Sequence, residues 1–313
     1  MAICVFDVFP DGTATVPGDF HLTGPGTFRW WHFDLSDPDL AIWAQKNLPE
    51  IPAKSLLQSE TRPRCDEFDT GLILNLRGIN LNAGQPADQM VSVRIWAASQ
   101  VLVTVRVRKV FALDEIRQAI LDGHPPLEVA GFLGQLTYIL TKRVQVHVLD
   151  LAALTDDFEE SIEEDTGQLP ASFGETRRSV IKLRRYLEPQ RNALHQLATL
   201  DVSFIAEKDK LTLRELSNRS TLAVEELDAL RDRMATLQAH HDSVVAARHG
   251  HNGYVLSAVA AIFLPLGFLT GLFGVNVAGM PGIESPFAFA VLCISMALLA
   301  ALMVWFMRWK HWL

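Results

Sequence analysis

The stretch GLFGVNVAGMPG, residues 271–282, joins two long apolar runs near the end of the chain. The first run is YVLSAVAAIFLPLGFLTGLF (254–273) and the second is FAFAVLCISMALLAALMVWF (287–306), and neither contains a charged residue. Each run is about as long as a helix needs to cross roughly 30 Å of hydrocarbon. A buried core helix of a soluble protein would explain one such run. Two in succession predict a transmembrane hairpin over 254–313.

The basic residues around the hairpin predict its orientation. Arg248 precedes the first apolar run, Arg308 and Lys310 follow the second, and the connection contains no Lys or Arg. The positive-inside rule therefore places both ends of the hairpin in the cytoplasm and the 274–286 loop outside. The opening MAICVFDVFPDG lacks the basic region of a signal peptide. We therefore expect a multi-pass membrane protein with cytoplasmic N- and C-termini.

Composition excludes several classes of protein. The formal net charge is -8, whereas a general nucleic-acid binder needs clustered Lys and Arg to displace counterions from phosphate. Cys4, Cys65 and Cys293 are far apart and form no CxxC pair, so neither a disulfide framework nor a thiolate zinc site is expected. Loops of the type GxxxxGK[ST], GxGxxG, HExxH and GxSxG are absent. The chain is therefore not expected to be an enzyme or to hold a catalytic cofactor.

The first 150 residues predict a cytoplasmic α/β domain with a mixed or antiparallel sheet. Strand composition is found in TGLILNLRGINL (70–81), MVSVRIWAAS (90–99) and QVLVTVRVRKV (100–110). The alternation in VTVRVRKV has the period of two that is typical of a half-buried strand. A helix is expected to open at Asp114, and helical periodicity continues from PLEVAGFLGQL onward.

Residues 151–253 predict a helical stalk region. Apolar residues repeat with spacings of three and four, so one helix from Val202 to Phe273 would form both the stalk and the first span. The repeat fits an intrachain bundle with helix 176–200, an oligomeric stalk, or both. We call the following residues the heptad seam: Leu213, Leu216, Ser220, Ala223, Leu227, Leu230, Met234, Leu237, His241, Val244, Arg248 and His251.

An acidic segment, DDFEESIEED (156–165), is a candidate metal site in the cytoplasm. Clustered carboxylates suit divalent cations, although a solvated acidic helix would have the same composition. In a third alternative, the basic residues between Arg177 and Arg185 fold back against the segment. The candidate ligands are Asp156, Asp157, Glu160, Glu163 and Glu164.

Histidines near the membrane are a second candidate metal site. His240 and His251 are eleven residues apart, about three helical turns, so they cannot bind one ion within a single helix. In an oligomer, His241 and His251 would each form a ring around the axis, and imidazole both binds zinc or nickel and titrates near neutral pH. The alternative is that these are ordinary exposed histidines of a stalk.

The glycine-rich connection predicts a break in the helix at the outer edge of the membrane. Irregular backbone at that depth is tolerated where it lines a cavity or water. If several copies surround an axis, the Asn276 amides and nearby carbonyls would form an uncharged polar ring, which is how selectivity filters hold cations. An ordinary tight hairpin is the alternative on composition alone.

Two C-terminal spans with a Gly-x-Asn tripeptide after the first resemble the CorA metal-ion transporter superfamily, whose usual tripeptide is GMN. Here the tripeptide is Gly274, Val275 and Asn276, and TGLFGVNVAGMPG is similar to the ZntB zinc-transporter branch. RPRCDEFDTGLILNLRGINLN (62–82) and LRRYLEPQRNAL (183–194) share that similarity. The resemblance implies a CorA-like funnel: a homopentamer with a cytoplasmic α/β domain, a pore lined by the first transmembrane helix, and the GVN tripeptide at its outer mouth.

The resemblance also implies transport of divalent cations, with zinc first and cadmium or nickel next. Magnesium or cobalt, as in the GMN branch, is the alternative cargo. Val275 replaces methionine, and Gly282 stands where the magnesium branch usually has an acid, so both differences favour zinc. Glu284 would attract the cation to the outer mouth, and the pore would pass Thr270, Gly267, Leu264 and Ala260. Proton coupling through His241 or His251 and a non-conducting membrane-tethered metal sensor are further hypotheses.

Overall fold

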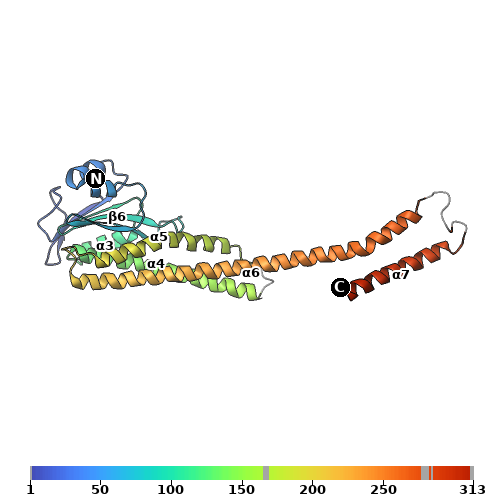
Figure 1. Ribbon diagram of the computed structural model, residues 1–313. Coiled ribbons are helices and arrows are strands. Elements are labelled where there is room, and N and C mark those ends of the chain that lie inside the picture. Colours follow the sequence, from blue (N-terminus) through green and yellow to red (C-terminus); the bar gives the residue numbers. More distant parts are fainter. Residues whose placement is uncertain (1, 165–168, 276–281, 283–284, 311–313) are drawn as a thin grey trace. The chain divides into compact units, whose positions relative to one another are not determined.

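The computed structural model describes residues 2–164, 169–275, 282 and 285–310 (Figure 1). The chain forms two compact units, Met1–Gln238 and Ala239–Leu313, which we call the N-terminal and the C-terminal unit. The boundary predicted at residue 150 falls inside a continuous helix, α4 (Val129–Glu164). The functional division at residues 150 and 253 remains a prediction.

The N-terminal unit contains a seven-stranded sheet with the order β2-β1-β3-β7-β6-β5-β4. β3 and β7 are parallel, and the other neighbours are antiparallel. The predicted mixed sheet is therefore confirmed. The strands are β1 (Cys4–Val8), β2 (Ala14–Thr15), β3 (Phe28–Asp34), β4 (Arg64–Phe68), β5 (Gly71–Gly78), β6 (Val91–Ala98) and β7 (Val101–Arg106).

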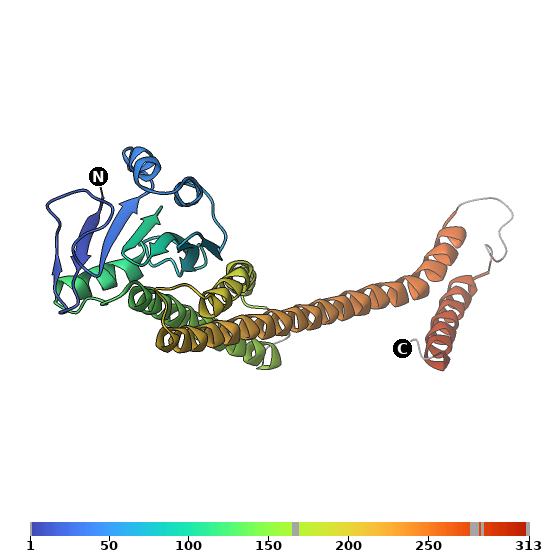
Figure 2. The ribbon, with the colours of Figure 1, turned by 60° about the vertical axis from the view of Figure 1, so that its left-hand side comes forward.

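Both faces of this sheet are covered. Figure 2 shows the blue helices α1 (Leu40–Asn47) and α2 (Glu50–Leu56) on one side and the green helices on the other. Side chains on successive strand residues point to opposite faces, so Trp30 packs with Phe132 of α4 while Trp31 packs with Trp43 of α1.

The expectation of a half-buried strand at VTVRVRKV is wrong. All residues of β7 from Val101 to Val105 are buried. The strand lies in the middle of the sheet with a hydrophobic core on each face, so alternation of residue types did not mark a solvent face.

The remaining helices differ from expectation mainly at their ends. α3 spans Phe111–Leu121, so it begins three residues before the predicted Asp114. α5 spans Phe173–Thr199 and continues through Pro189. α6 spans Glu207–Phe273, so it begins after the predicted Val202 and ends where predicted.

The heptad seam packs inside the chain. Its residues from Leu213 to Met234 are buried, and those from Ala223 onward share a core with Val148 of α4 and Leu183 of α5. The intrachain bundle is therefore confirmed, while an oligomeric stalk remains a prediction. Leu237 is half-buried, and beyond it the seam is half-buried or exposed.

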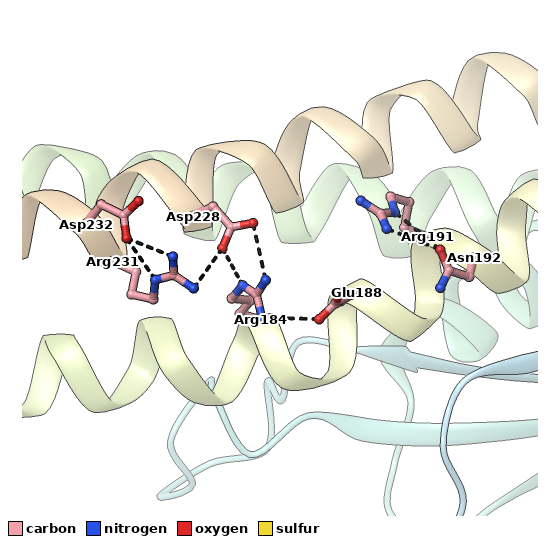
Figure 3. Close-up of polar contacts among 7 residues, drawn as sticks. All are labelled: Arg184, Glu188, Arg191, Asn192, Asp228, Arg231 and Asp232. Atoms are coloured by element: carbon pink, nitrogen blue, oxygen red, sulfur yellow. Dashed lines mark hydrogen bonds and ion pairs between the residues drawn. The ribbon is translucent and has the colours of Figure 1, made fainter.

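An ion-pair network also joins α5 to α6 (Figure 3). Arg184 of α5 donates to both carboxylate oxygens of Asp228 on α6 and, at 3.1 Å, to Glu188 of its own helix. Arg231 lies 3.4 Å from Asp228 and 2.8 Å from Asp232. This network fixes the side of α5 that faces α6.

The C-terminal unit contains the end of α6 and α7 (Ala288–Trp309). Among the described residues, these two helices are long and apolar enough to cross a membrane. Their large apolar side chains are mostly exposed, for example Leu264, Phe268 and Leu298. A buried core helix would hide such side chains, so the structure agrees with two membrane spans.

Candidate functional site

The first span ends at Gly274, whose amide makes the last hydrogen bonds back to the helix. The Gly274 amide donates to the carbonyl of Thr270 at 2.9 Å and to that of Gly271 at 3.2 Å. A Cβ atom at Gly274 would lie 2.9 Å from the Thr270 carbonyl oxygen. Glycine is therefore needed for this close approach of the backbone.

The predicted tripeptide lies only partly within the described residues. Val275 is about half exposed. Asn276 lies outside the described residues, and so does Glu284, the predicted outer acid. Their roles therefore remain predictions.

One face of the first span is covered within the C-terminal unit. Ala258 is buried, and together with Met307 of α7 it lines a hollow of about 280 Å³. Half-buried residues continue along the same face, as the helical spacing of three and four residues requires. They are Ile262, Pro265, Leu266 and Leu269.

The predicted pore residues avoid this covered face. At about 100° per residue, Ala260, Leu264 and Gly267 lie roughly half a turn from Ala258, and all three are exposed. Thr270 lies at the edge of this uncovered face, and its hydroxyl donates to the Gly267 carbonyl at 3.0 Å. We call these four residues the uncovered line.

The uncovered line carries no charge. Two aliphatic side chains, one glycine and one hydroxyl already bonded to its own helix offer few ligands for a dehydrated cation. Zinc is held tightly by thiolate, imidazole and carboxylate groups. A cation passing this line would therefore keep most of its water.

The two candidate histidines are not brought together by α6. His241 is half-buried and His251 is exposed, and ten residues of helix separate them by about 15 Å. His251 lines a hollow of about 480 Å³ with Arg248 and Asn252. A single chain therefore offers no shared ligand site from this pair.

Two carboxylates of the acidic segment are paired with an arginine that the sequence did not predict. Arg233 of α6 donates to Glu159 at 2.9 and 2.7 Å and to Asp156 at 2.5 Å. Hydrogen bonds that Arg233 donates to the Glu159 and Asp156 carboxylates raise its pKa. In the sequence, Arg233 directly precedes Met234 of the heptad seam. This position next to the seam was the one sequence signal that could have placed Arg233 against α4.

Among the described side chains, Lys182 and Arg184 of α5 pair with residues outside the acidic segment. Lys182 pairs with Asp88 at 3.0 Å, and Arg184 pairs with Asp228 and Glu188. Asp157 and Glu160 are exposed, and the side chains of Glu163 and Glu164 are not described. Within the described part of the chain, no three His, Cys, Asp or Glu side chains are grouped as metal ligands.

The chain is similar to known transporters over almost its whole length. A family model described as "CorA-like Mg2+ transporter protein" matches residues 25–309. The zinc transport protein ZntB of Yersinia enterocolitica is 32% identical over 286 residues, which cover 91% of this chain and 88% of that protein. The divalent cation transporter CmaX of Pseudomonas aeruginosa is 33% identical over 294 residues, covering 92% and 89%. The solved structure of full-length CmaX matches with a TM-score of 0.85 at 30% identity, covering 99% of this chain and 98% of that one.

Proposed function

This chain belongs to the CorA family of divalent cation transporters, and we propose that its main cargo is zinc. It is a membrane transporter with two C-terminal transmembrane helices, and not an enzyme, as the sequence predicted. The α/β domain, the long helix and the apolar hairpin form the CorA-like fold that the resemblance implied.

Zinc is favoured by the relatives and by the tripeptide. The Yersinia relative is named a zinc transport protein, and Val275 and Gly282 depart from the magnesium pattern. Nickel shares zinc's affinity for imidazole nitrogen and the resemblance implies cadmium as well, so we rank these two next. Magnesium or cobalt is the alternative cargo, because the matching family model is described by Mg2+.

The uncovered line on α6 is the observation that carries the proposed pathway. In a homopentamer, the α6 copies would place Ala260, Leu264, Gly267 and Thr270 toward the axis, while Ala258 faces α7. Gly274, Val275 and Asn276 would form the outer mouth as a ring of dipoles, which binds a hydrated cation without trapping it. Glu284 would attract the cation to that mouth by its charge.

Proton coupling is the second part of the proposal. A span without carboxylates cannot exchange protons for metal along its length. Four histidines precede the span on the predicted cytoplasmic side, His240, His241, His249 and His251, and we assign the coupling to His241 and His251 of the heptad seam. Imidazole binds metal only in its neutral form, so metal release at the cytoplasmic end would depend on pH. The protein would act in a bacterial inner membrane with both termini in the cytoplasm.

The test is metal entry into vesicles that contain the reconstituted full chain and a zinc-sensitive dye. Native protein, Asn276→Ala and the control Asn218→Ala would be compared with and without an inward proton gradient. Asn218 is an exposed amide of α6 that lies far from the tripeptide in the sequence. We expect zinc entry to be lost in Asn276→Ala, kept in Asn218→Ala, and accelerated by the gradient.

The competing outcomes separate the alternatives. Faster entry of magnesium or cobalt than of zinc would reassign the cargo. No entry of zinc, cadmium, nickel, cobalt or magnesium through well-folded oligomers would contradict transport and favour a metal sensor. The engagement of Asp156 and Glu159 by Arg233 leaves the sensor with less support than the sequence suggested.

A further inference from the structure

A polar cavity of about 740 Å³ lies in the N-terminal unit. Its walls come from the loop after α2, from β5, from the start of β6, from the end of β7 and from α5. Five cationic side chains line it, together with the ring of Tyr186. They are Arg62, Arg77, Arg108, Lys182 and Arg185.

Arg77 is held in a fixed position at this cavity. Its guanidinium donates to the carbonyls of Met90 at 3.1 Å and Thr61 at 2.7 Å. The same group lies 4.1 Å from the centroid of the Tyr186 ring. Both partners in the hydrogen bonds are neutral, so the positive charge of Arg77 is not cancelled by them.

The fully buried Arg94 adds positive charge beside the half-buried Arg77. Arg94 is 0% exposed and donates only to neutral oxygens, the carbonyls of Gln58 and Ser59 and the hydroxyl of Ser92. Burial, together with the charge of Arg77, lowers the pKa of Arg94 to about 10. A buried charge without a counterion is costly, so an anion bound nearby would be stabilised.

The acidic residues at the cavity do not balance its cations. Asp88 already pairs with Lys182 at 3.0 Å and accepts a hydrogen bond from Ser179 at 3.0 Å. Glu60 is exposed at the rim. Within the part of the chain that the structure describes, no ion pair is formed by Arg62, Arg108 or Arg185. The excess is unusual in a chain with a formal charge of -8.

The α5 wall of the cavity is fixed in position by an ion pair to α6. Lys182, Arg185 and Tyr186 line the cavity, while Arg184 on the same helix pairs with Asp228 of α6 (Figure 3). A binding wall that is fixed before the ligand arrives loses less entropy on binding. The α5 wall is therefore held in place before a ligand binds, while Arg62, Arg108, Lys182 and Arg185 are exposed around the cavity.

We propose that this cavity binds a soluble phosphate-bearing metabolite of about nucleotide size, with at least two phosphate groups. Arginine is suited to phosphate because its planar guanidinium donates two parallel hydrogen bonds. Each phosphate group brings roughly 1.5 to 2 negative charges at neutral pH, so two of them match the uncompensated cations. The volume falls in the range of about 300–1,000 Å³ that is usual for small-molecule sites.

The test is ligand binding to the purified full chain in buffer freed of metal ions by a chelating resin. The probes are pyrophosphate, ADP, adenosine and glycerol phosphate, the last standing for a lipid headgroup. We expect pyrophosphate and ADP to bind, with affinity that falls as salt is raised, and adenosine not to bind. Arg185→Gln and, separately, Arg108→Gln would each weaken binding by about tenfold, since each removes a charge-assisted hydrogen bond.

Arg177→Gln is the matched control, because Arg177 is an exposed arginine of α5 outside the cavity. It would leave binding unchanged. Failure of pyrophosphate and ADP to bind the folded native oligomer would overturn the proposal, as would equal weakening by Arg177→Gln and Arg185→Gln. Binding of glycerol phosphate without pyrophosphate would assign the cavity to a lipid headgroup instead and also overturn it.

Discussion

Ala258 of α6 and Met307 of α7 are buried together in the C-terminal unit, where both line one hollow. This contact defines the face of the first span that packs against the second. Ala260, only two residues away, lies on the opposite face and is exposed. The proposed ion pathway depends on this distinction between two faces of one helix.

Gly274→Ala should impair transport at the outer mouth. Its new Cβ atom would lie 2.9 Å from the Thr270 carbonyl oxygen, so the end of the helix must shift. Overpacking of this kind typically costs about 1–3 kcal/mol, and we expect zinc uptake by vesicles to fall by about tenfold or more. Gly253→Ala on the same helix meets open space and should keep native uptake. Equal uptake by the two variants would show that Gly274 is not part of the outer mouth.

Replacing both His241 and His251 by alanine should flatten the pH dependence of zinc uptake. Imidazole binds metal only in its neutral form, so the pH dependence of uptake measured from pH 5.5 to 8 should weaken in the double variant. His124→Ala, an exposed histidine of the N-terminal unit, should keep the native profile. An unchanged profile in the double variant would show that these two histidines do not cause the pH dependence of uptake.

His32 should make the N-terminal unit sensitive to mild acid. Burial lowers its pKa to about 3, while its Nδ1 lies 2.9 Å from the Thr104 hydroxyl. Between pH 6.5 and 3 the unfolded chain binds a proton here that the folded chain does not. The stabilising contribution is therefore complete above pH 6.5 and is lost as pH falls, by at most about 1.4 kcal/mol per pH unit.

Thermal unfolding of the full chain, followed by tryptophan fluorescence between pH 7.5 and 4.5, measures this effect. His32→Asn keeps a polar atom near Thr104 but does not titrate, so its Tm should fall less steeply with pH than that of the native chain. His195→Asn, at an exposed position, should follow the native slope. Parallel slopes for native and His32→Asn would show that another group causes the acid sensitivity.

Much of the fold could be predicted because its signals are periodic. The apolar run ending at Phe273 and the heptad seam through Met234 were both read correctly from spacing alone. β7 was placed correctly, but its burial was not, because alternation cannot show that α1 and α2 cover the second face. Covering elements lie far away in the sequence, and only the tertiary structure reveals them.

The candidate sites were less predictable, since they depend on contacts between distant residues. The acidic segment looked available for a cation until Arg233, 77 residues from Asp156, was found to bind it. The arginine cavity combines Arg62, Arg108 and Arg185, whose spacing forms no motif. The tripeptide was recognised by resemblance, and its Asn276 lies outside the described residues.

The claim that metal ions pass along the uncovered line is tested most directly by thiol labelling during transport. Leu264→Cys and Leu266→Cys would be made in a Cys293→Ser background, because Cys293 is exposed. Burial raises the pKa of the Cys4 and Cys65 thiols to about 12, so these two remain unreactive.

Zinc uptake by vesicles would be measured before and after addition of a water-soluble, positively charged methanethiosulfonate reagent. Leu264 lies on the uncovered line and Leu266 on the half-buried face with Ala258. We predict that the reagent blocks uptake through Leu264→Cys and leaves Leu266→Cys active. Block of Leu266→Cys with Leu264→Cys unaffected, or no block of either, would contradict the proposed pathway.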